Sequence, residues 1–157
     1  MKASVYIETT ILSYLVSRPS RDLIVAAHQQ LTHEWWDRHR ISYDCYISQI
    51  VLNEITKGDP TESEKRQEIA NMFELLDVND KAAAIAEELI RKQILPPKAA
   101  QDAIHIAVAV VNGMDFLLTW NCAHIANARI EREISSLCQE KGLQSPVICT
   151  PEELMVG

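Results

Sequence analysis

The sequence contains only four glycines and six prolines, whereas apolar residues make up 47% of its 157 positions. This composition excludes a collagen-like, disordered or loop-rich chain and leaves enough apolar side chains for a sizeable core. The length is that of one ordinary domain, so we expect a single domain over residues 1–157. No segment approaches the roughly 20 consecutive apolar residues that a membrane span needs.

Cysteines are few, and none of the four belongs to a C-x-x-C pair. Their scattered positions favour neither a disulfide framework nor a zinc site, and they fit reduced thiols. Glu8 and two threonines interrupt the short apolar stretch at the N-terminus, which is not typical of a secretion signal. We therefore expect a soluble, cytoplasmic protein that does not associate with a membrane.

An excess of basic charge is also absent, since the formal net charge is −7. Proteins that bind nucleic acid normally present a positive face, so this charge counts against such a role. The objection weakens if some carboxylates surround a metal ion that neutralises them. A local basic rim would still guide phosphates, and binding without metal would then be weak and sensitive to salt.

Short β-like segments alternate with helical stretches along the chain, which is typical of a mostly parallel sheet covered by helices. The Thr61 and Glu64 pair, in the pattern T-x-x-E, predicts a capping box at one helix start. The expected fold is an α/β three-layer αβα sandwich. Strands are predicted over 4–7, 44–47, 75–78, 116–119 and 147–149, and helices over 10–16, 21–38, 49–57, from 61 onward, and over 82–93, 99–111 and 124–141.

In open parallel sheets, ligands bind just beyond the carboxyl ends of the strands. Glu8 ends the first predicted strand, and Asn121 follows the strand over 116–119. A carboxylate at such a junction can coordinate a metal ion. Alternatively, Glu8 does no more than favour the N-terminus of the following helix through the helix dipole.

Asp102 stands out because it lies on a nearly all-apolar helix that should be largely buried. An unpaired carboxylate there would cost several kcal/mol, so it needs a cation, a metal ion or hydrogen-bond donors. The alternative is an acid at the helix start that faces water. His105 lies on the same side of this helix, where hydrogen bonding to a carboxylate or packing is a commoner role than metal ligation.

Glu54 lies on a predicted helix whose apolar side includes Val51, Leu52 and Ile55. Taken alone, it fits a solvated acid on an amphipathic helix. Carboxylates gathered without metal would repel one another, whereas Mg²⁺ and Mn²⁺ prefer oxygen ligands. Such an ion lowers the pKa of a bound water and orients that water for attack on phosphorus.

Four segments together resemble the PIN-domain nucleases, and their order and spacing cover nearly the whole chain. These segments are V-Y-I-E-T-T at 5–10, I-V-L-N-E-I at 50–55, D-A-I-H-I-A at 102–107 and F-L-L-T-W-N at 116–121. The sequence is most similar to the short bacterial PIN proteins that act as toxins in toxin–antitoxin pairs. The resemblance implies a three-layer fold with a central parallel sheet and cleavage of single-stranded RNA that depends on Mg²⁺ or Mn²⁺.

By position, the resemblance assigns the family's three acids to Glu8, Glu54 and Asp102. Glu8 and Asp102 would hold the metal ion, and Glu54 would ligate it or position the attacking water. Asn121 falls where many members have a fourth acid and would orient water or substrate. Supporting roles fall to Thr9, Thr119 and His105, and the basic residues beside the motifs are Lys57, Lys98 and Arg18, each of which also fits a solvated surface residue.

Two positions depart from the family's pattern. Glu8 replaces the usual Asp and is one methylene longer, so its carboxylate must approach the metal differently. Asn121 removes one negative charge and should weaken the binding of a second metal ion. These departures favour a different function, that of a degenerate PIN domain that binds RNA or a protein partner without cleavage.

A phosphatase and a plain scaffold domain have less support. A phosphatase with an aspartyl nucleophile lacks the required Asp, because Glu8, Thr9 and Thr10 end the first strand. A scaffold domain would leave Asp102 without a physical reason.

The adjacent tryptophans Trp35 and Trp36 lie within the helix predicted over 21–38. Neighbouring residues on a helix point about 100° apart, so the two indoles should not be equally buried. We expect one of them to contribute to a homodimer or to an antitoxin-binding groove.

Overall fold

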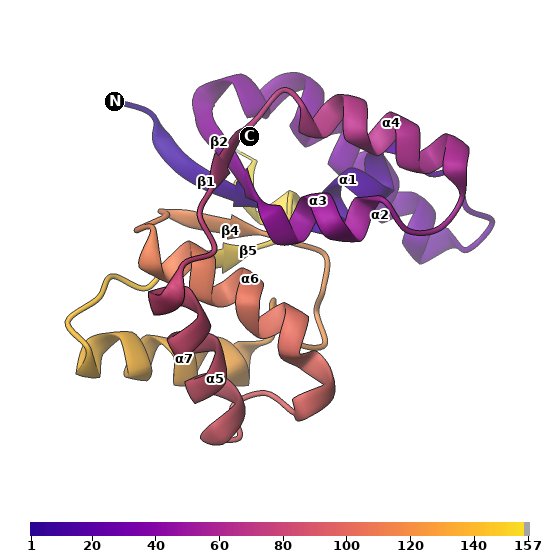
Figure 1. Ribbon diagram of the computed structural model, residues 1–157. Coiled ribbons are helices and arrows are strands. Elements are labelled where there is room, and N and C mark those ends of the chain that lie inside the picture. Colours follow the sequence, from indigo (N-terminus) through magenta and orange to yellow (C-terminus); the bar gives the residue numbers. More distant parts are fainter. Residues whose placement is uncertain (156–157) are drawn as a thin grey trace.

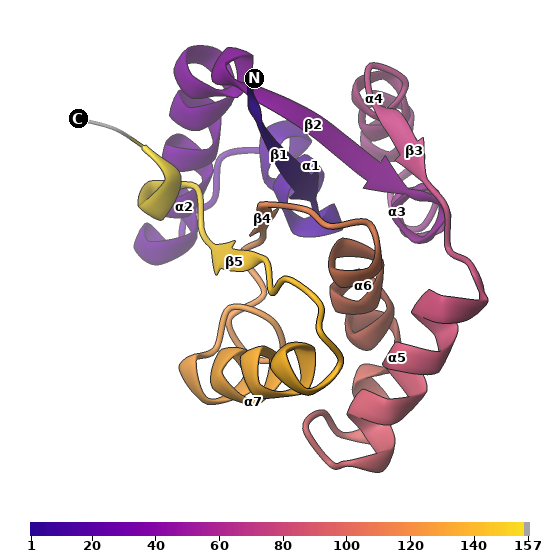
Figure 2. The same ribbon diagram turned by 90° about the vertical axis from the view of Figure 1, so that its left-hand side faces the viewer.

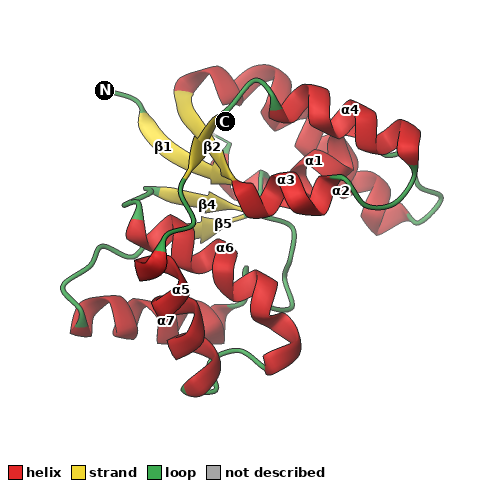
Figure 3. Cartoon of the chain, viewed as in Figure 1, coloured by secondary structure: helices red, strands yellow, loops and turns green. Residues whose placement is uncertain are grey.

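The computed structural model describes residues 1–155, in which five parallel strands form one sheet (Figures 1 and 3). The order across the sheet is β3-β2-β1-β4-β5, and every neighbouring pair is parallel. The expected three-layer α/β fold is therefore confirmed. The strands are β1 (Ala3–Ile7), β2 (Tyr43–Ser48), β3 (Glu74–Leu76), β4 (Phe116–Leu118) and β5 (Val147–Cys149).

Seven α-helices cover the two faces of the sheet within the described residues (Figure 2). Helices α1 to α4 lie on one face and α5 to α7 on the other, as right-handed crossovers between parallel strands require. Short 3₁₀ turns occur at Arg40–Ser42, Pro97–Ala99 and Glu152–Leu154. The helices are α1 (Thr9–Val16), α2 (Leu23–Glu34), α3 (Gln49–Ile55), α4 (Pro60–Ala70), α5 (Asp80–Arg91), α6 (Ala100–Val111) and α7 (Ala128–Glu140).

The crossovers leave β1 in one direction, toward β2 and β3, whereas β4 and β5 lie on the other side of β1. A sheet with this order has its topological switch point between β1 and β4, where ligands bind outside the carboxyl ends of the strands. Glu8 directly follows β1, and Thr119 directly follows β4. The fold therefore brings these two side chains to the place where a ligand site is expected.

Helix α6 is the most buried helix that the sequence predicts, and the structure confirms its burial. Six consecutive residues from His105 to Val110 are buried, and five of the six are apolar. Strands β1 and β4 supply the facing layer, in which Tyr6 and its register partner Leu117 are fully buried. His105 is therefore a polar group in the middle of the core and needs hydrogen-bond partners.

The helix expected over 21–38 ends earlier as a regular α-helix, because a π-helical turn occupies Trp35–His39. Trp35 is fully buried, whereas Trp36 is only partly buried and lies under the Arg40 guanidinium. The expectation that the two indoles are unequally buried is thus confirmed. At the start of α2, Leu23 is 85% exposed, so the apolar residues of this helix do not form one continuous buried face.

The predicted capping box at Thr61 and Glu64 is wrong. Helix α4 begins at Pro60, and the Asp59 carboxylate accepts hydrogen bonds from the backbone amides of Thr61 and Glu62. Proline at the first helical position has no amide hydrogen to satisfy, which favours this earlier start. Among residues 1–155, no helix is long and apolar enough to cross a membrane, and the four cysteines are free thiols.

The Asp59 cap gives a stability prediction. We expect Asp59→Ala to lower the free energy of unfolding by about 1 kcal/mol, because two amides at the start of α4 lose their acceptor. Thr61→Ala, at an exposed neighbouring position, should stay within about 0.5 kcal/mol of the wild type. Urea unfolding followed by circular dichroism measures the free energy of unfolding of both variants. A larger decrease for Thr61→Ala than for Asp59→Ala would show that Thr61, and not Asp59, caps the helix.

Candidate active site

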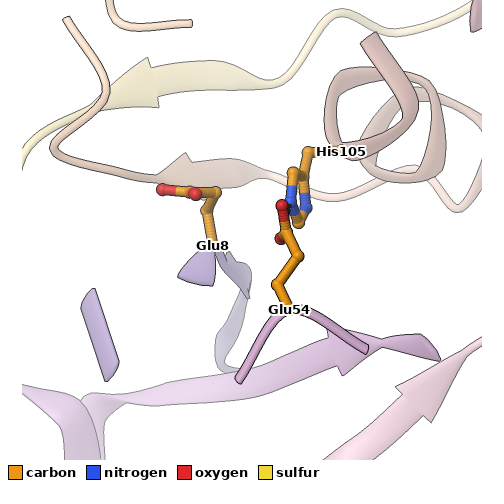
Figure 4. A group of neighbouring side chains, drawn as sticks. All are labelled: Glu8, Glu54 and His105. Atoms are coloured by element: carbon orange, nitrogen blue, oxygen red, sulfur yellow. Dashed lines mark hydrogen bonds and ion pairs between the residues drawn. The ribbon is translucent and has the colours of Figure 1, made fainter. Parts of the chain in front are cut away.

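Three ionisable side chains meet beyond the carboxyl ends of β1 and β4 (Figure 4). Glu8 comes from the end of β1, Glu54 from the last turn of α3 and His105 from the middle of α6. One potential ligand atom from each lies within 4.8 Å of the others. Glu8 is 3% exposed and His105 is fully buried, whereas the Glu54 side chain is 19% exposed.

The Glu8 carboxylate is held by hydroxyl groups from two elements. Its Oε1 accepts hydrogen bonds from Thr10 Oγ1 at 2.5 Å and from Thr119 Oγ1 at 2.5 Å. Although Glu8 occupies the N-cap position of α1, its side chain makes no capping hydrogen bond. Burial raises the pKa of Glu8, and the electrostatic effect of His105 and the two hydroxyls only partly offset this rise.

The Glu54 carboxylate lies against the His105 ring and has different electrostatics from the Glu8 carboxylate. Its Oε1 accepts hydrogen bonds from Thr9 Oγ1 at 2.5 Å and from His105 Nε2 at 2.6 Å. Partial burial raises the pKa of Glu54, but the hydrogen bond and electrostatic effect of His105, the Thr9 hydroxyl and the charge of Lys57 outweigh it and leave the pKa lowered. Glu54 is therefore ionised at neutral pH.

His105 is positioned to hold Glu54 rather than to ligate a metal ion. Its Nε2 contacts Glu54, and its Nδ1 lies 2.7 Å from the Tyr6 hydroxyl, so both ring nitrogens have partners. The Tyr6 hydroxyl in turn lies 2.7 Å from Ser48 Oγ. Metal ligation by His105 would require one of these hydrogen bonds to break.

Asp102 lies outside this close group, in a second set of polar side chains. Its Oδ1 accepts a hydrogen bond from Asn121 Nδ2 at 3.0 Å, and its Oδ2 lies 3.1 Å from His124 Nδ1. The backbone amide of Asn121 donates to Thr119 Oγ1 at 2.9 Å, and Thr119 donates to Glu8. The Asp102 carboxylate on α6 therefore has two partners, the Asn121 amide and the His124 imidazole. Thr119 connects this set of side chains to the group around Glu8.

The three basic residues expected at the substrate side are all exposed. Lys57, just after α3, lowers the pKa of Glu54 by its charge, so it acts on the site electrostatically. Lys98 lies in the 3₁₀ turn before α6, and Arg18 lies between α1 and α2. Within residues 1–155, neither the Lys98 nor the Arg18 side chain makes an ion pair or hydrogen bond with the site.

Comparison with known protein families identifies the group to which this site belongs. The sequence model of the PIN domain matches residues 5–121, which include every acid of the site. The chain belongs to the PIN domain family. Proteins of this family are generally metal-dependent nucleases, and no individual curated protein matches this sequence.

A solved structure shares the fold at low sequence identity. A chain of VapBC2 from Rickettsia felis, crystallised with a DNA fragment from the promoter of these proteins, has a TM-score of 0.58 and 14% identity. The match covers 94% of this chain and 98% of that chain. VapBC-5 from Mycobacterium tuberculosis, of the VapBC family of toxin–antitoxin systems, gives a TM-score of 0.46 at 14% identity, over 76% of this chain and 86% of that one.

The PIN motifs alone do not reveal four residues that the structure adds to the site: Tyr6, Ser48, Thr10 and His124. Ser48 ends β2, so the rule that ligand sites lie beyond strand ends would have found it. Tyr6 lies inside a predicted strand and reads as core. His124 lies in the loop after Asn121, and only the fold shows that it faces Asp102.

The oxygen atoms that remain free suit a hard divalent cation. Hydrogen bonds from other side chains of residues 1–155 engage Oε1 of Glu8 and Oε1 of Glu54, but not Oε2 of either residue. Two carboxylates with one uncommitted oxygen each are the ligand type that Mg²⁺ and Mn²⁺ prefer. Such an ion would also neutralise the charge that burial makes unfavourable at Glu8.

The raised pKa of Glu8 predicts how pH changes the stability of the metal-free protein. Between the pKa of an unperturbed glutamate, about 4.3, and the raised pKa, the folded state binds more protons than the unfolded state. Stability without metal should therefore fall as the pH rises through this window. Glu8→Gln should remove that loss and raise the melting temperature at pH 7 in EDTA, by about 2–4 °C for each kcal/mol gained.

Thermal unfolding at several pH values tests this prediction, with Glu133→Gln on the exposed side of α7 as the matched control. We also expect added Mn²⁺ to raise the melting temperature of the wild type but not that of Glu8→Gln, because the variant lacks the ligand charge. A Glu8→Gln protein that is less stable than the wild type in EDTA at pH 7 would contradict the unfavourable burial of the Glu8 charge.

Proposed function

We propose that this PIN domain is a metal-dependent ribonuclease that cleaves single-stranded RNA. The observation that carries the proposal is the pair of carboxylates, Glu8 and Glu54, at the switch point of the sheet. They have ligand atoms within 4.8 Å of each other, and each keeps one oxygen without a hydrogen-bond partner among residues 1–155. A metal ion there would lower the pKa of a water and stabilise the leaving oxygen during hydrolysis. The identity of the ion as Mg²⁺ or Mn²⁺ is part of the proposal.

Each acidic side chain has a proposed role. Glu8 holds the ion, and Asp102 joins it by giving up one of its present contacts with Asn121 and His124. Glu54 is ionised and is fixed by two donors, which suits a group that ligates the ion or positions and deprotonates the attacking water. Thr119 connects the two sets by donating to Glu8 and accepting from the backbone of Asn121.

The substrate would approach over the exposed basic residues that follow or precede the motif helices. Lys57 is the best supported phosphate contact, because its charge already acts on Glu54. Lys98 and Arg18 are proposed as outer contacts, from their positions before α6 and after α1. Since the net charge is −7, binding of RNA should depend on the metal ion and on this local rim.

A protein antitoxin is the proposed partner, and the protein itself would be a cytoplasmic toxin. We propose that residues 1–157 form a single domain. This proposal is supported by the fold shared with the R. felis VapBC2 chain and by the resemblance to toxin-type PIN proteins. The partly buried Trp36, beside Phe73 and Arg40, is the indole that we propose for a homodimer contact or an antitoxin groove.

A degenerate, non-cleaving PIN domain is the second candidate function. The observation in its favour is that both carboxylate oxygens of Asp102 already have protein partners, Asn121 and His124. A metal ion would have to replace at least one of these contacts. In a degenerate domain, the polar set of Asp102 stabilises the loop after β4 and the chain binds RNA or protein without hydrolysis.

The first test is cleavage of a labelled single-stranded RNA. We expect cleavage in the presence of Mg²⁺ or Mn²⁺, none in EDTA, and a loss of about 100-fold or more in Asp102→Asn, which removes a ligand charge. Asp77→Asn, an exposed change of the same chemistry, is the matched control and should cleave as the wild type does. Folded wild-type protein that cleaves with neither ion would favour the degenerate domain.

The second test places an acid at position 121. Asn121→Asp should make the metal-free protein less stable by about 1–3 kcal/mol, because the amide donor to Asp102 becomes a second carboxylate. The same change should tighten Mn²⁺ binding roughly tenfold, since the ligand charge increases. Calorimetric titration with Mn²⁺ and thermal unfolding measure the two effects. If neither changes, position 121 does not face the metal site.

A further inference from the structure

Behind Glu54, a continuous chain of hydrogen bonds runs through the core from β2 to α6. Ser48 Oγ lies 2.7 Å from the Tyr6 hydroxyl, which lies 2.7 Å from His105 Nδ1. His105 Nε2 then lies 2.6 Å from Glu54 Oε1. Ser48, Tyr6 and His105 are each 0% exposed, so no solvent competes for these contacts.

The elements of the fold bring these residues together by register. Tyr6 of β1 is paired with Tyr46 of β2, and Ser48 follows Tyr46 by two residues, so it lies on the same face of the sheet as Tyr46. His105 packs against that face from α6, with its ring centroid 5.8 Å from the Tyr6 ring. Three separate elements, β1, β2 and α6, therefore contribute residues to this chain of hydrogen bonds.

The chemistry of the end groups gives this chain a direction. A carboxylate oxygen accepts hydrogen bonds, so His105 Nε2 carries the hydrogen in its contact with Glu54. In a neutral imidazole, Nδ1 is then an acceptor, and the Tyr6 hydroxyl is its donor. Because that hydrogen is committed to His105, the Tyr6 oxygen accepts from the Ser48 hydroxyl.

We propose that Tyr6 is a positioning residue of the active site, which acts on Glu54 through the tautomer and ring orientation of His105, with Ser48 supporting it. The inference rests on the proposed function, because it gives this chain a purpose in metal binding. Fixing Oε1 of Glu54 leaves Oε2 as the oxygen without a hydrogen-bond partner among residues 1–155, and so available to a metal ion. Groups that orient a metal ligand from behind are typically worth about 10–100-fold in metal affinity or activity.

Tyr6→Phe removes one oxygen atom and keeps the aromatic ring in the core. We expect the affinity for Mn²⁺, measured by calorimetric titration, to fall roughly tenfold, with RNA cleavage restored at higher Mn²⁺. Nitrogen-15 spectra of the histidine ring should show the Nε2–H tautomer in the metal-free wild type and a mixture of tautomers in the variant. Ser48→Ala should have the smaller effect, because the Tyr6 hydroxyl still donates to His105.

Tyr46→Phe is the matched control, since Tyr46 is the register partner of Tyr6 and its hydroxyl makes no hydrogen bond to another residue in 1–155. It should leave both the Mn²⁺ affinity and the His105 spectrum unchanged. A purely structural Tyr6 hydroxyl would lower the melting temperature of Tyr6→Phe without changing the Mn²⁺ affinity, and that result would overturn the proposal. An unchanged tautomer in Tyr6→Phe would overturn it as well.

The same measurements distinguish a failure of the proposed function from a failure of this inference. If the wild type binds Mn²⁺ and Tyr6→Phe weakens that binding, but no RNA is cleaved, the positioning role stands and the ribonuclease does not. If RNA is cleaved and the two proteins bind Mn²⁺ equally, the ribonuclease stands and the positioning role is overturned. A wild type that binds no Mn²⁺ would refute both.

Discussion

The burial of the Glu8 carboxylate is the constraint around which the rest of the site is built. A parallel sheet has its interior strands covered on both faces, so a side chain at the end of β1 has little contact with water. Two threonine hydroxyls donate hydrogen bonds to this buried carboxylate, one from α1 and one from the segment after β4. These donors hold the carboxylate in place, but they do not remove the unfavourable effect of burial, because the pKa of Glu8 stays raised.

Glu54 and Asp102 show how the same chain accommodates acids whose charge is satisfied. Glu54 receives a threonine hydroxyl and a buried histidine, which favour its charge, whereas Asp102 receives an amide and a half-buried histidine. Among these three acids, Glu8 would gain most from a bound cation, which would link metal binding to stability. Both departures from the family pattern have a structural counterpart. The longer side chain at position 8 coincides with anchoring of one carboxylate oxygen by two threonines, and the Asn121 amide satisfies Asp102 without a metal ion.

Much of the fold could be predicted from the spacing of apolar residues, because helices and strands repeat their buried positions with different periods. The order of strands and helices was predicted fully, as was the burial of α6. Details set by a few side chains were not: the cap at Asp59 instead of Thr61, and the π-helical turn at Trp35. In each case, a short-range contact decides between local conformations of similar energy.

By itself, the sequence determined the strand-end position of Glu8, the presence of polar residues on the apolar helix α6, and the family to which the motifs belong. The tertiary structure alone decided which of these side chains meet. Glu8, Glu54 and His105 are separated by 46 and 51 residues along the chain, and only the crossovers of the parallel sheet bring them within 4.8 Å. The fold also decided that His105 contacts Glu54 and that Asp102 contacts Asn121 and His124, because hydrogen-bond partners depend on distances in space that residue spacing does not encode.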